Sequence, residues 1–321
     1  MTRELIERLL KGDRRALARL LSLVENGTPE GMEALRRIHR FTGQAGTVGI
    51  TGATGSGKST LVSQIAKEFH RRGKKVGIIA VDPSSPFTQG ALLGDRVRMQ
   101  ELCQDEDIFV RSMASRGALG GLAETTMDAM ALMDAFGKEV ILVETVGAGQ
   151  DEVAVVQATR TTVVLLTPGT GDDVQMMKAG LMEIGHIYVV NKSDREGAPG
   201  LTQQLNHVLS LAPSKAWNPP VLNTVATTGQ GIAPLVDAIQ RHWKFLAESG
   251  LGAADNRQRI RHHVLSLVQQ KFLQHTLARL RANGTLESLV NAVTRGELDP
   301  QSAAEKILDN LFAPSKTQPS N

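Results

Sequence analysis

The sequence predicts an α/β fold: a doubly wound, mostly parallel sheet over residues 46–249, with a helical extension before it and a helical arm after it. Short apolar segments alternate with helical ones through this range, which is typical of strands and helices in a parallel sheet. A glycine-rich turn joins the first strand to the first helix, and polar motifs follow several later strands. Ligands bind at the carboxyl ends of such strands, so these motifs are expected to share one edge of the sheet.

Residues 1–45 are expected to form the helical extension. Apolar side chains recur at helical spacing between Met1 and Val24, so this stretch predicts a single amphipathic helix. Its arginine and leucine content also fits a mitochondrial targeting peptide, but acidic residues interrupt the stretch and serine is scarce, which favours the ordinary helix. Thr28-Pro29 is typical of a helix start, and a second helix is expected from Met32 to Phe41.

Seven strands are expected in the central domain, with helices between most of them that cover both faces of the sheet. The expected strands are residues 48–51, 76–82, 107–111, 139–144, 162–167, 186–191 and 220–225.

The first strand runs into a phosphate-binding loop of the pattern G-x-x-x-x-G-K-[ST], and a helix follows, as in P-loop NTPases. Glycines let several backbone N–H groups face one anion, and the positive end of the next helix adds to that field. Lys58 is expected to reach the outer phosphates, and the Ser59 hydroxyl to bind Mg²⁺. The residues expected to bind nucleotide here are Gly52, Ala53, Thr54, Gly55, Ser56, Gly57, Lys58, Ser59 and Thr60.

The strand at 186–190 is followed by Asn191-Lys192-Ser193-Asp194, the N-K-x-D pattern that reads guanine. The Asp194 carboxylate can accept two N–H bonds from guanine, whereas adenine would leave it unpaired. The Asn191 amide can meet the O6/N7 edge of the base, and the Lys192 stem can cover one face of the ring. A polar turn after a strand often contains Asn and Asp, but the phosphate loop upstream favours the guanine site.

Three acidic positions are candidates for a metal and phosphate site. Glu144 ends one strand in Glu-Thr-Val-Gly147, where a metal-facing carboxylate and a glycine N–H that senses the terminal phosphate are expected. Asp82 ends another strand and Asp95 follows it, so both are candidate Mg²⁺ ligands, directly or through water. A turn residue and a helix cap are the alternative interpretations of Asp82 and Asp95. The expected catalytic set is Lys58, Glu144, Gly147 and Asp95.

The strings GATGSGKST, VDPSSP, LLGDRVRM, ETVGAGQDE and NKSD together resemble the MeaB/ArgK group of P-loop GTPases over nearly the whole chain. The resemblance implies a homodimeric GTPase with a low intrinsic rate, which assists an adenosylcobalamin-dependent methylmalonyl-CoA mutase. It places GTP or GDP and Mg²⁺ in the site. The residues that it places around the phosphates and Mg²⁺ are Lys58, Ser59, Asp82, Asp95 and Glu144, and those around guanine are Asn191, Lys192 and Asp194.

Two positions depart from the pattern of this group. The guanine-side loop, often Ser-Ala-x-x-Gly in relatives, here reads Val225-Ala226-Thr227-Thr-Gly229, so a backbone N–H of Ala226 or Thr227 is expected to serve guanine O6 in place of a serine hydroxyl. Gln150 lies three residues after Gly147, whereas the water-orienting glutamine of Ras-like GTPases directly follows that glycine. Gln150 is therefore only a candidate by analogy.

Residues 250–314 are expected to form a helical dimerisation region, and residues 315–321 a disordered tail. A periodic helix is expected at 256–282, ended by Asn283-Gly284, with shorter helices at about 285–295 and 300–312. The apolar face of the long helix is expected to pack against another surface, either a second subunit or the chain's own central domain. Relatives in the resembled group dimerise through this region, which favours a second subunit.

Composition excludes several alternatives. The chain has one cysteine, so intrachain disulfides and C-x-x-C metal sites are impossible. The net charge of +3 favours neither nucleic acid nor a membrane as partner, and no apolar run is long enough for a membrane span, so a cytoplasmic protein is expected. Two other functions compete: a nickel-type metal-insertion GTPase, which the scattered histidines disfavour, and a P-loop kinase, which the guanine motif disfavours.

Overall fold

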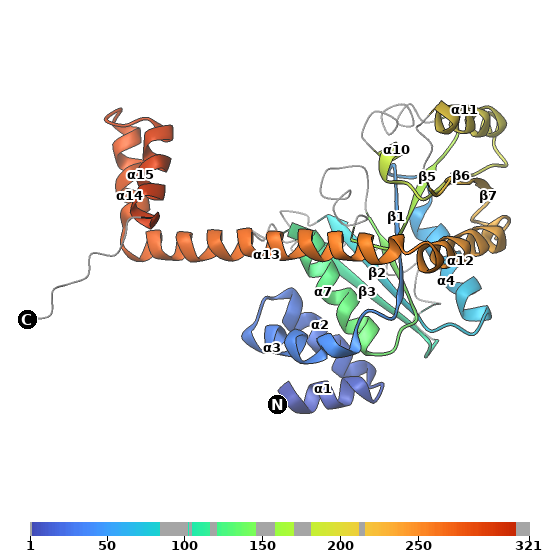
Figure 1. Cartoon of the computed structure of the whole chain (residues 1–321), viewed down its shortest axis with the longest axis horizontal. Helices are drawn as coiled ribbons and strands as arrows, with labels where there is room; N and C mark the ends of the chain where they lie inside the picture. The colour runs from blue at the N-terminus through green and yellow to red at the C-terminus, as the bar shows by residue number, and fades with distance from the viewer. Residues whose placement is uncertain are drawn as a thin grey trace, which may run out of the picture. The chain divides into compact units, whose positions relative to one another are not determined.

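The computed structural model describes residues 2–83, 102, 105–115, 121–145, 158–169, 181–211 and 216–312. The chain divides into two compact units, Met1–His263 and Val264–Asn321. The first unit holds the sheet and the helices that cover it (Figure 1).

Seven strands form one parallel sheet in the order β3-β2-β4-β1-β5-β6-β7. Each begins within about two residues of its predicted start, and the predicted parallel α/β fold is confirmed. The central strand β1 lies between β4 and β5, so the strand order reverses there, and a ligand crevice is expected at its carboxyl end. The strands are β1 (Gly46–Gly52), β2 (Val76–Pro83), β3 (Ile108–Ser115), β4 (Val140–Glu144), β5 (Thr161–Leu166), β6 (Ile187–Asn191) and β7 (Val221–Thr224).

Successive apolar residues of the strands face opposite helical layers, as expected for a sheet buried on both sides. Ile78 and Leu142 belong to a core with α4 and α12, whereas Ile79 and Val143 belong to a core with α7 and the N-terminal helices. A third, smaller core lies between α11 and strands β5 and β6. The described helices between strands are α4 (Lys58–Arg71), α7 (Gly121–Ala135), α10 (Leu181–Ile184) and α11 (Ala198–Leu211), and α12 (Ile232–Glu248) follows the last strand.

The N-terminal region contains two helices where the sequence predicted one over Met1 to Val24, so that prediction is wrong. Gly12 adopts a φ of +84°, and Asp13 caps a new helix by accepting hydrogen bonds from the backbone N–H groups of Arg15 and Ala16. The left-handed glycine and the capping carboxylate end one helix and start another, although the helical spacing of apolar residues continues across them. The elements of this region are α1 (Thr2–Leu10), α2 (Arg14–Glu25), α3 (Pro29–Ile38) and the 3₁₀ helix η1 (His39–Phe41).

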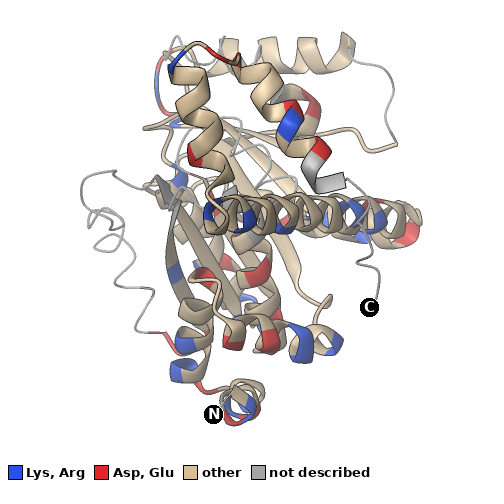
Figure 2. Cartoon of the chain, turned by 90° about the vertical axis from the view of Figure 1, so that its left-hand side faces the viewer, with Lys and Arg blue, Asp and Glu red and all other residues tan. Residues whose placement is uncertain are grey.

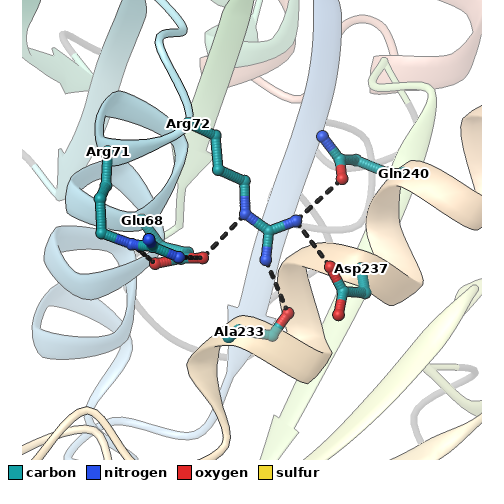
Figure 3. Close-up of polar contacts among 6 residues, drawn as sticks. All are labelled: Glu68, Arg71, Arg72, Ala233, Asp237 and Gln240. Carbon is teal, nitrogen blue, oxygen red and sulfur yellow. Dashed lines mark hydrogen bonds and ion pairs between the residues drawn. The ribbon is translucent and has the colours of Figure 1, made fainter.

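Arg72, just after α4, ties that helix to α12 (Figure 3). Its guanidinium is largely buried and lies 2.7 Å from the Glu68 carboxylate and 2.6 Å from that of Asp237. Further hydrogen bonds run to Gln240 and to the Ala233 carbonyl. Together, Arg71 and Arg72 lower the pKa of Glu68 to about 2. α4 begins in the phosphate loop and α12 follows the guanine-side loop, so this network connects the two helices that adjoin these loops.

Three helices end the described chain: α13 (Leu251–Ala282), α14 (Thr285–Thr294) and α15 (Pro300–Phe312). The long helix begins at Leu251, earlier than the predicted residue 256, because only Ser249 and Gly250, the latter at a φ of +72°, separate it from α12. It ends where predicted, at Asn283-Gly284. Lys and Arg far outnumber acidic residues along α13 (Figure 2).

Several apolar side chains of α13 are exposed, among them Val264, Leu265, Val268 and Phe272. Across the described part of the chain, no helix combines the length and the apolar character needed to cross a lipid bilayer.

Candidate nucleotide-binding site

The phosphate loop leaves the carboxyl end of β1, at the point where the strand order reverses. Gly52, Gly55 and Gly57 adopt φ values of +155°, +78° and +95°. A Cβ atom at Gly52 would lie 2.3 Å from the Leu165 carbonyl oxygen, and one at Gly57 would lie 2.6 Å from the Asn191 side-chain nitrogen. Both the backbone conformation and the close neighbours therefore require glycine at these two positions.

Lys58, the first residue of α4, is buried and its side chain turns back over the loop. Its Nζ donates hydrogen bonds to the carbonyl oxygens of Gly52, at 2.8 Å, and Ala53, at 3.0 Å. The ammonium group therefore lies inside the curve of the loop, beside the start of the helix. A fixed positive charge next to a helix N-terminus favours an anion. In the same loop Ala53 and Ser56 are buried, Thr60 is half-buried, and Thr54 and Gly55 are exposed.

Ser59 and Glu144, both expected from the sequence to be Mg²⁺ ligands, lie in contact with each other. The Ser59 hydroxyl donates a 2.5 Å hydrogen bond to Oε1 of Glu144, which is the last residue of β4 and is 6% exposed. β4 pairs directly with β1, with Glu144 opposite Ile50, which places the carboxylate beside the start of the loop. A hydroxyl and a carboxylate are both oxygen ligands of the kind that Mg²⁺ prefers.

Of the remaining predicted metal and phosphate residues, the structure describes only the backbone of Asp82. Asp82 lies near the end of β2, beyond Ala80, which pairs with Glu144. Its backbone therefore lies at the same edge of the sheet, but its side chain is outside the described residues. Asp95, Gly147 and Gln150 also lie outside them.

Asn191, at the end of β6, joins the phosphate loop to the guanine-side loop. Its Nδ2 donates to the Ser56 carbonyl oxygen at 2.8 Å. Its Oδ1 accepts from the Thr224 hydroxyl and from the Ala226 backbone N–H, each at 3.1 Å. The side chain is 2% exposed, so these bonds are made away from water, where leaving them unmade is costly.

Lys192 follows with a φ of +55°, the only left-handed residue other than glycine in the described chain. Its Nζ donates a 2.7 Å hydrogen bond to the Gly55 carbonyl, so its aliphatic stem spans from the N-K-x-D motif to the phosphate loop. Asp194 is exposed beyond it. This turn thus leaves the Asp194 carboxylate accessible at the edge of the sheet.

The guanine-side loop closes between Val225 and Gln230, which form an isolated bridge. The sequence offered the N–H of Ala226 or of Thr227 as a donor to the base. The Ala226 N–H is already used by Asn191, and this leaves Thr227, which is exposed. Sequence reasoning missed Thr224, a fully buried residue whose hydroxyl holds Asn191. Its position near the end of the predicted strand 220–225 was the one signal in the sequence, and the structure adds that this strand, β7, lies beside β6.

Comparison with known proteins agrees with this geometry. Residues 17–281 match the family model described as "Methylmalonyl Co-A mutase-associated GTPase MeaB". A Pyrococcus abyssi protein that is named provisionally as a GTPase is 48% identical over 316 residues, covering 97% of each chain. GTPase ArgK of Escherichia coli K12 is 33% identical, covering 95% of each chain.

Two further similarities extend the comparison. The mouse protein named "Methylmalonic aciduria type A homolog, mitochondrial" is 32% identical, covering 94% of this chain and 77% of its own. The crystal structure of LAO/AO transport system kinase superposes with a TM-score of 0.73 and 26% identity, covering 97% of each chain. From the family model and these relatives, the chain belongs to the MeaB family of methylmalonyl-CoA mutase-associated P-loop GTPases.

Proposed function

We propose that this GTPase hydrolyses GTP with Mg²⁺ and uses its nucleotide state to assist an adenosylcobalamin-dependent methylmalonyl-CoA mutase as a chaperone. The single observation that carries the chemical part is the Ser59–Glu144 contact beside the buried Lys58. These three groups place two oxygen ligands and one fixed positive charge around the start of α4. That arrangement suits a divalent cation and a phosphate chain bound next to each other.

Each residue has a role in this proposal. Lys58 binds the outer phosphates, and Ser59 and Glu144 hold Mg²⁺, with Asp82 and Asp95 as further candidates. When bound, Mg²⁺ neutralises charge on the phosphates. Gly147 and Asp95 are assigned to the terminal phosphate from the motif alone.

Guanine selectivity is assigned to Asp194, whose accessible carboxylate can accept two N–H bonds from the base. The Lys192 stem covers one face of the ring, and the Thr227 N–H serves O6. Only one of the two Nδ2 hydrogens of Asn191 is needed for the Ser56 carbonyl, so the other can reach guanine N7.

Dimerisation is assigned to the arm, residues 256–312. Ile260, Val264, Val268 and Phe272 recur every fourth residue on α13, and each is about half exposed. A stripe of this spacing follows one face of a helix and is typical of a surface that packs on another subunit.

The experiment that tests the chaperone assignment uses the purified protein and the methylmalonyl-CoA mutase of the same organism. Complex formation, GTP turnover and retention of mutase activity over many cycles are measured with GDP and with a non-hydrolysable GTP analogue. A partner that reads the nucleotide state must bind the two forms with different affinity and must itself alter nucleotide affinity. Absence of a complex in both states, with neither activity changed, would refute the assignment.

A further inference from the structure

A groove of about 520 Å³ lies between α1 and the segment where α3 passes into η1. On α1 it is lined by Arg3, Ile6, Glu7 and Leu10, which lie at the i, i+3, i+4 and i+7 positions of one helix face. The groove is part of the first unit, and the nucleotide site described above does not include it.

The groove has an apolar floor. Leu10 on α1 and Phe41 in η1 are each 39% exposed, although both are large apolar side chains, and Ile6 lies buried between the helices. Two such side chains facing one concave surface offer an apolar contact that a partner can cover.

The rim of the groove is basic. Arg3, Arg37 and Arg40 line it, with Glu7 as the one acidic lining residue. Glu7 lies 3.2 Å from Arg3, which offsets its charge. Arg37 shares Glu33 with Arg36, and the Arg37 side chain remains 54% exposed.

Arg40 stacks its guanidinium 4.7 Å from the centre of the Phe41 ring, where basic rim and apolar floor meet. Guanidinium groups bind carboxylates in a bidentate manner, and the floor requires apolar side chains from the same ligand. The seven-residue span on α1 is about 10 Å, or two helical turns, which suits a second helix with anchors at i, i+3 or i+4, and i+7.

We propose that this groove is a docking site for an acidic amphipathic helix of a protein partner. The charge of the rim selects the acidic residues of that helix, and the exposed Leu10 and Phe41 receive its apolar face. This inference is independent of the mutase assignment, because it rests on the groove alone.

The location of the N-terminal helices indicates that docking is independent of the bound nucleotide. Arg14 of α2 donates hydrogen bonds to the carbonyls of Asp105, Glu106 and Ile108, at the amino end of β3. The Asp134 carboxylate accepts N–H bonds from residues 43–45, just before β1. The region is therefore fixed at the amino edge of the sheet, whereas the phosphate loop lies at the carboxyl edge.

The test uses the full-length protein and two fluorescein-labelled synthetic helices, about 14 residues long. Both carry leucine at i, i+3, i+7 and i+10, and they differ only in having glutamate or lysine at the remaining positions. By fluorescence anisotropy, the acidic helix is expected to bind at least about 10-fold more tightly than the basic one. The affinity is expected to change less than about 2-fold between GDP and a GTP analogue.

Matched variants locate the site. The double variant Arg37→Glu, Arg40→Glu is expected to weaken binding of the acidic helix at least about 10-fold. Arg36→Glu is the control, because Arg36 is on the same helix and shares Glu33 but does not line the groove. Circular dichroism and GTP hydrolysis show whether each variant is folded. A second variant, Leu10→Ser, tests the apolar floor and is expected to weaken binding without a change of charge.

Three results would overturn the proposal: equal affinity for the acidic and basic helices, equal loss in the Arg36→Glu control, or no binding of the acidic helix at millimolar concentration. A third probe, the peptide of residues 285–312, tests a second copy of this chain as the occupant. That segment carries five acidic and two basic side chains. If it binds at least about 10-fold more tightly than the designed helix, the assignment to a different protein is wrong.

Discussion

Asn191 and Ser56 lie 135 positions apart in the sequence, and a 2.8 Å hydrogen bond joins the side-chain nitrogen of Asn191 to the carbonyl oxygen of Ser56. The side-chain oxygen of Asn191 accepts hydrogen bonds from the Thr224 hydroxyl and the Ala226 backbone N–H. One buried side chain thus fixes the spacing between the loop proposed to bind phosphate and the loop proposed to bind the base. A nucleotide that spans both loops meets a preorganised site, which reduces the entropic cost of binding.

Replacing Asn191 by alanine should therefore weaken both folding and nucleotide binding. Three hydrogen bonds at about 0.5 to 1.5 kcal/mol each predict a loss of roughly 1.5 to 4.5 kcal/mol in the free energy of unfolding. Urea unfolding measures the stability, and titration calorimetry with GDP measures the affinity. The control is Asn223→Ala, which removes one exposed bond to Thr202. Equal effects of the two substitutions would contradict the bracing role of Asn191.

Ser59→Ala should remove the Mg²⁺ dependence of nucleotide binding. The substitution deletes the hydroxyl that contacts Glu144. If both groups hold the cation, addition of Mg²⁺ should tighten GTP-analogue binding at least about 10-fold in the unmodified protein and less than about 2-fold in the variant. Ser63→Ala, one turn further along α4, is the matched control because, among the described residues, its hydroxyl donates to the Ser59 carbonyl and does not contact Glu144. A variant that keeps the full Mg²⁺ effect would exclude Ser59 as a ligand.

Asp194→Asn should change the choice of base. The new amide can donate to the 2-carbonyl of xanthine but cannot accept both guanine N–H groups, so affinity for GDP should fall at least about 100-fold and affinity for xanthosine diphosphate should rise. Asp194 is exposed, so the stability of the protein should change little. Competition binding with GDP, ADP and xanthosine diphosphate measures the selectivity. An unmodified protein with equal affinity for GDP and ADP would be evidence against the guanine assignment itself.

Val268→Glu should disrupt the proposed dimer. Val268 is 57% exposed in the middle of the apolar stripe on α13, and burying a carboxylate against a second subunit without a partner is unfavourable. Light scattering over a range of concentrations is expected to show a monomer for the variant and a dimer for the unmodified protein. Gln274→Glu adds the same charge at another exposed position of α13 and should leave the dimer intact. A dimer that survives Val268→Glu would place the contact elsewhere.

The sequence predicted the sheet well because its strands are uninterrupted apolar runs that can only be buried between two layers of helices. It also named Ser59 and Glu144 as candidate metal ligands, and these two side chains lie in contact because residues at the carboxyl ends of neighbouring parallel strands meet at one edge. The break at Gly12 was not predictable from periodicity, because the apolar repeat continues across it. The internal bonds of Asn191 depend on the order of β6 and β7 in the sheet, which no local pattern contains.

His242 provides a pH-dependent contribution to stability. Its ring is 1% exposed, accepts or donates a 2.9 Å hydrogen bond with the Thr161 hydroxyl, and lies 4.5 Å from the ring of His186. Burial, together with the nearby His186 and Arg259, lowers the pKa of His242 from 6.5 to about 3. The folded protein therefore keeps this ring neutral over a range in which the unfolded chain binds a proton.

Stability should consequently fall as the pH drops below 6.5, and this loss should be complete near pH 3. Each pH unit inside that window is worth up to 1.36 kcal/mol, so His242 alone predicts a loss of about 2 to 3 kcal/mol between pH 6.5 and 4.5. Urea unfolding at several pH values measures the slope. His242→Gln should lower stability at neutral pH, because packing against Trp217 is lost, but it should flatten the slope. His207→Gln, at an exposed position, should leave the slope unchanged. If the His242→Gln variant keeps the slope of the unmodified protein between pH 6.5 and 4.5, the acid sensitivity must come from groups other than His242, and Glu68 on α4, whose pKa Arg71 and Arg72 lower from 4.5 to about 2, contributes only below that window.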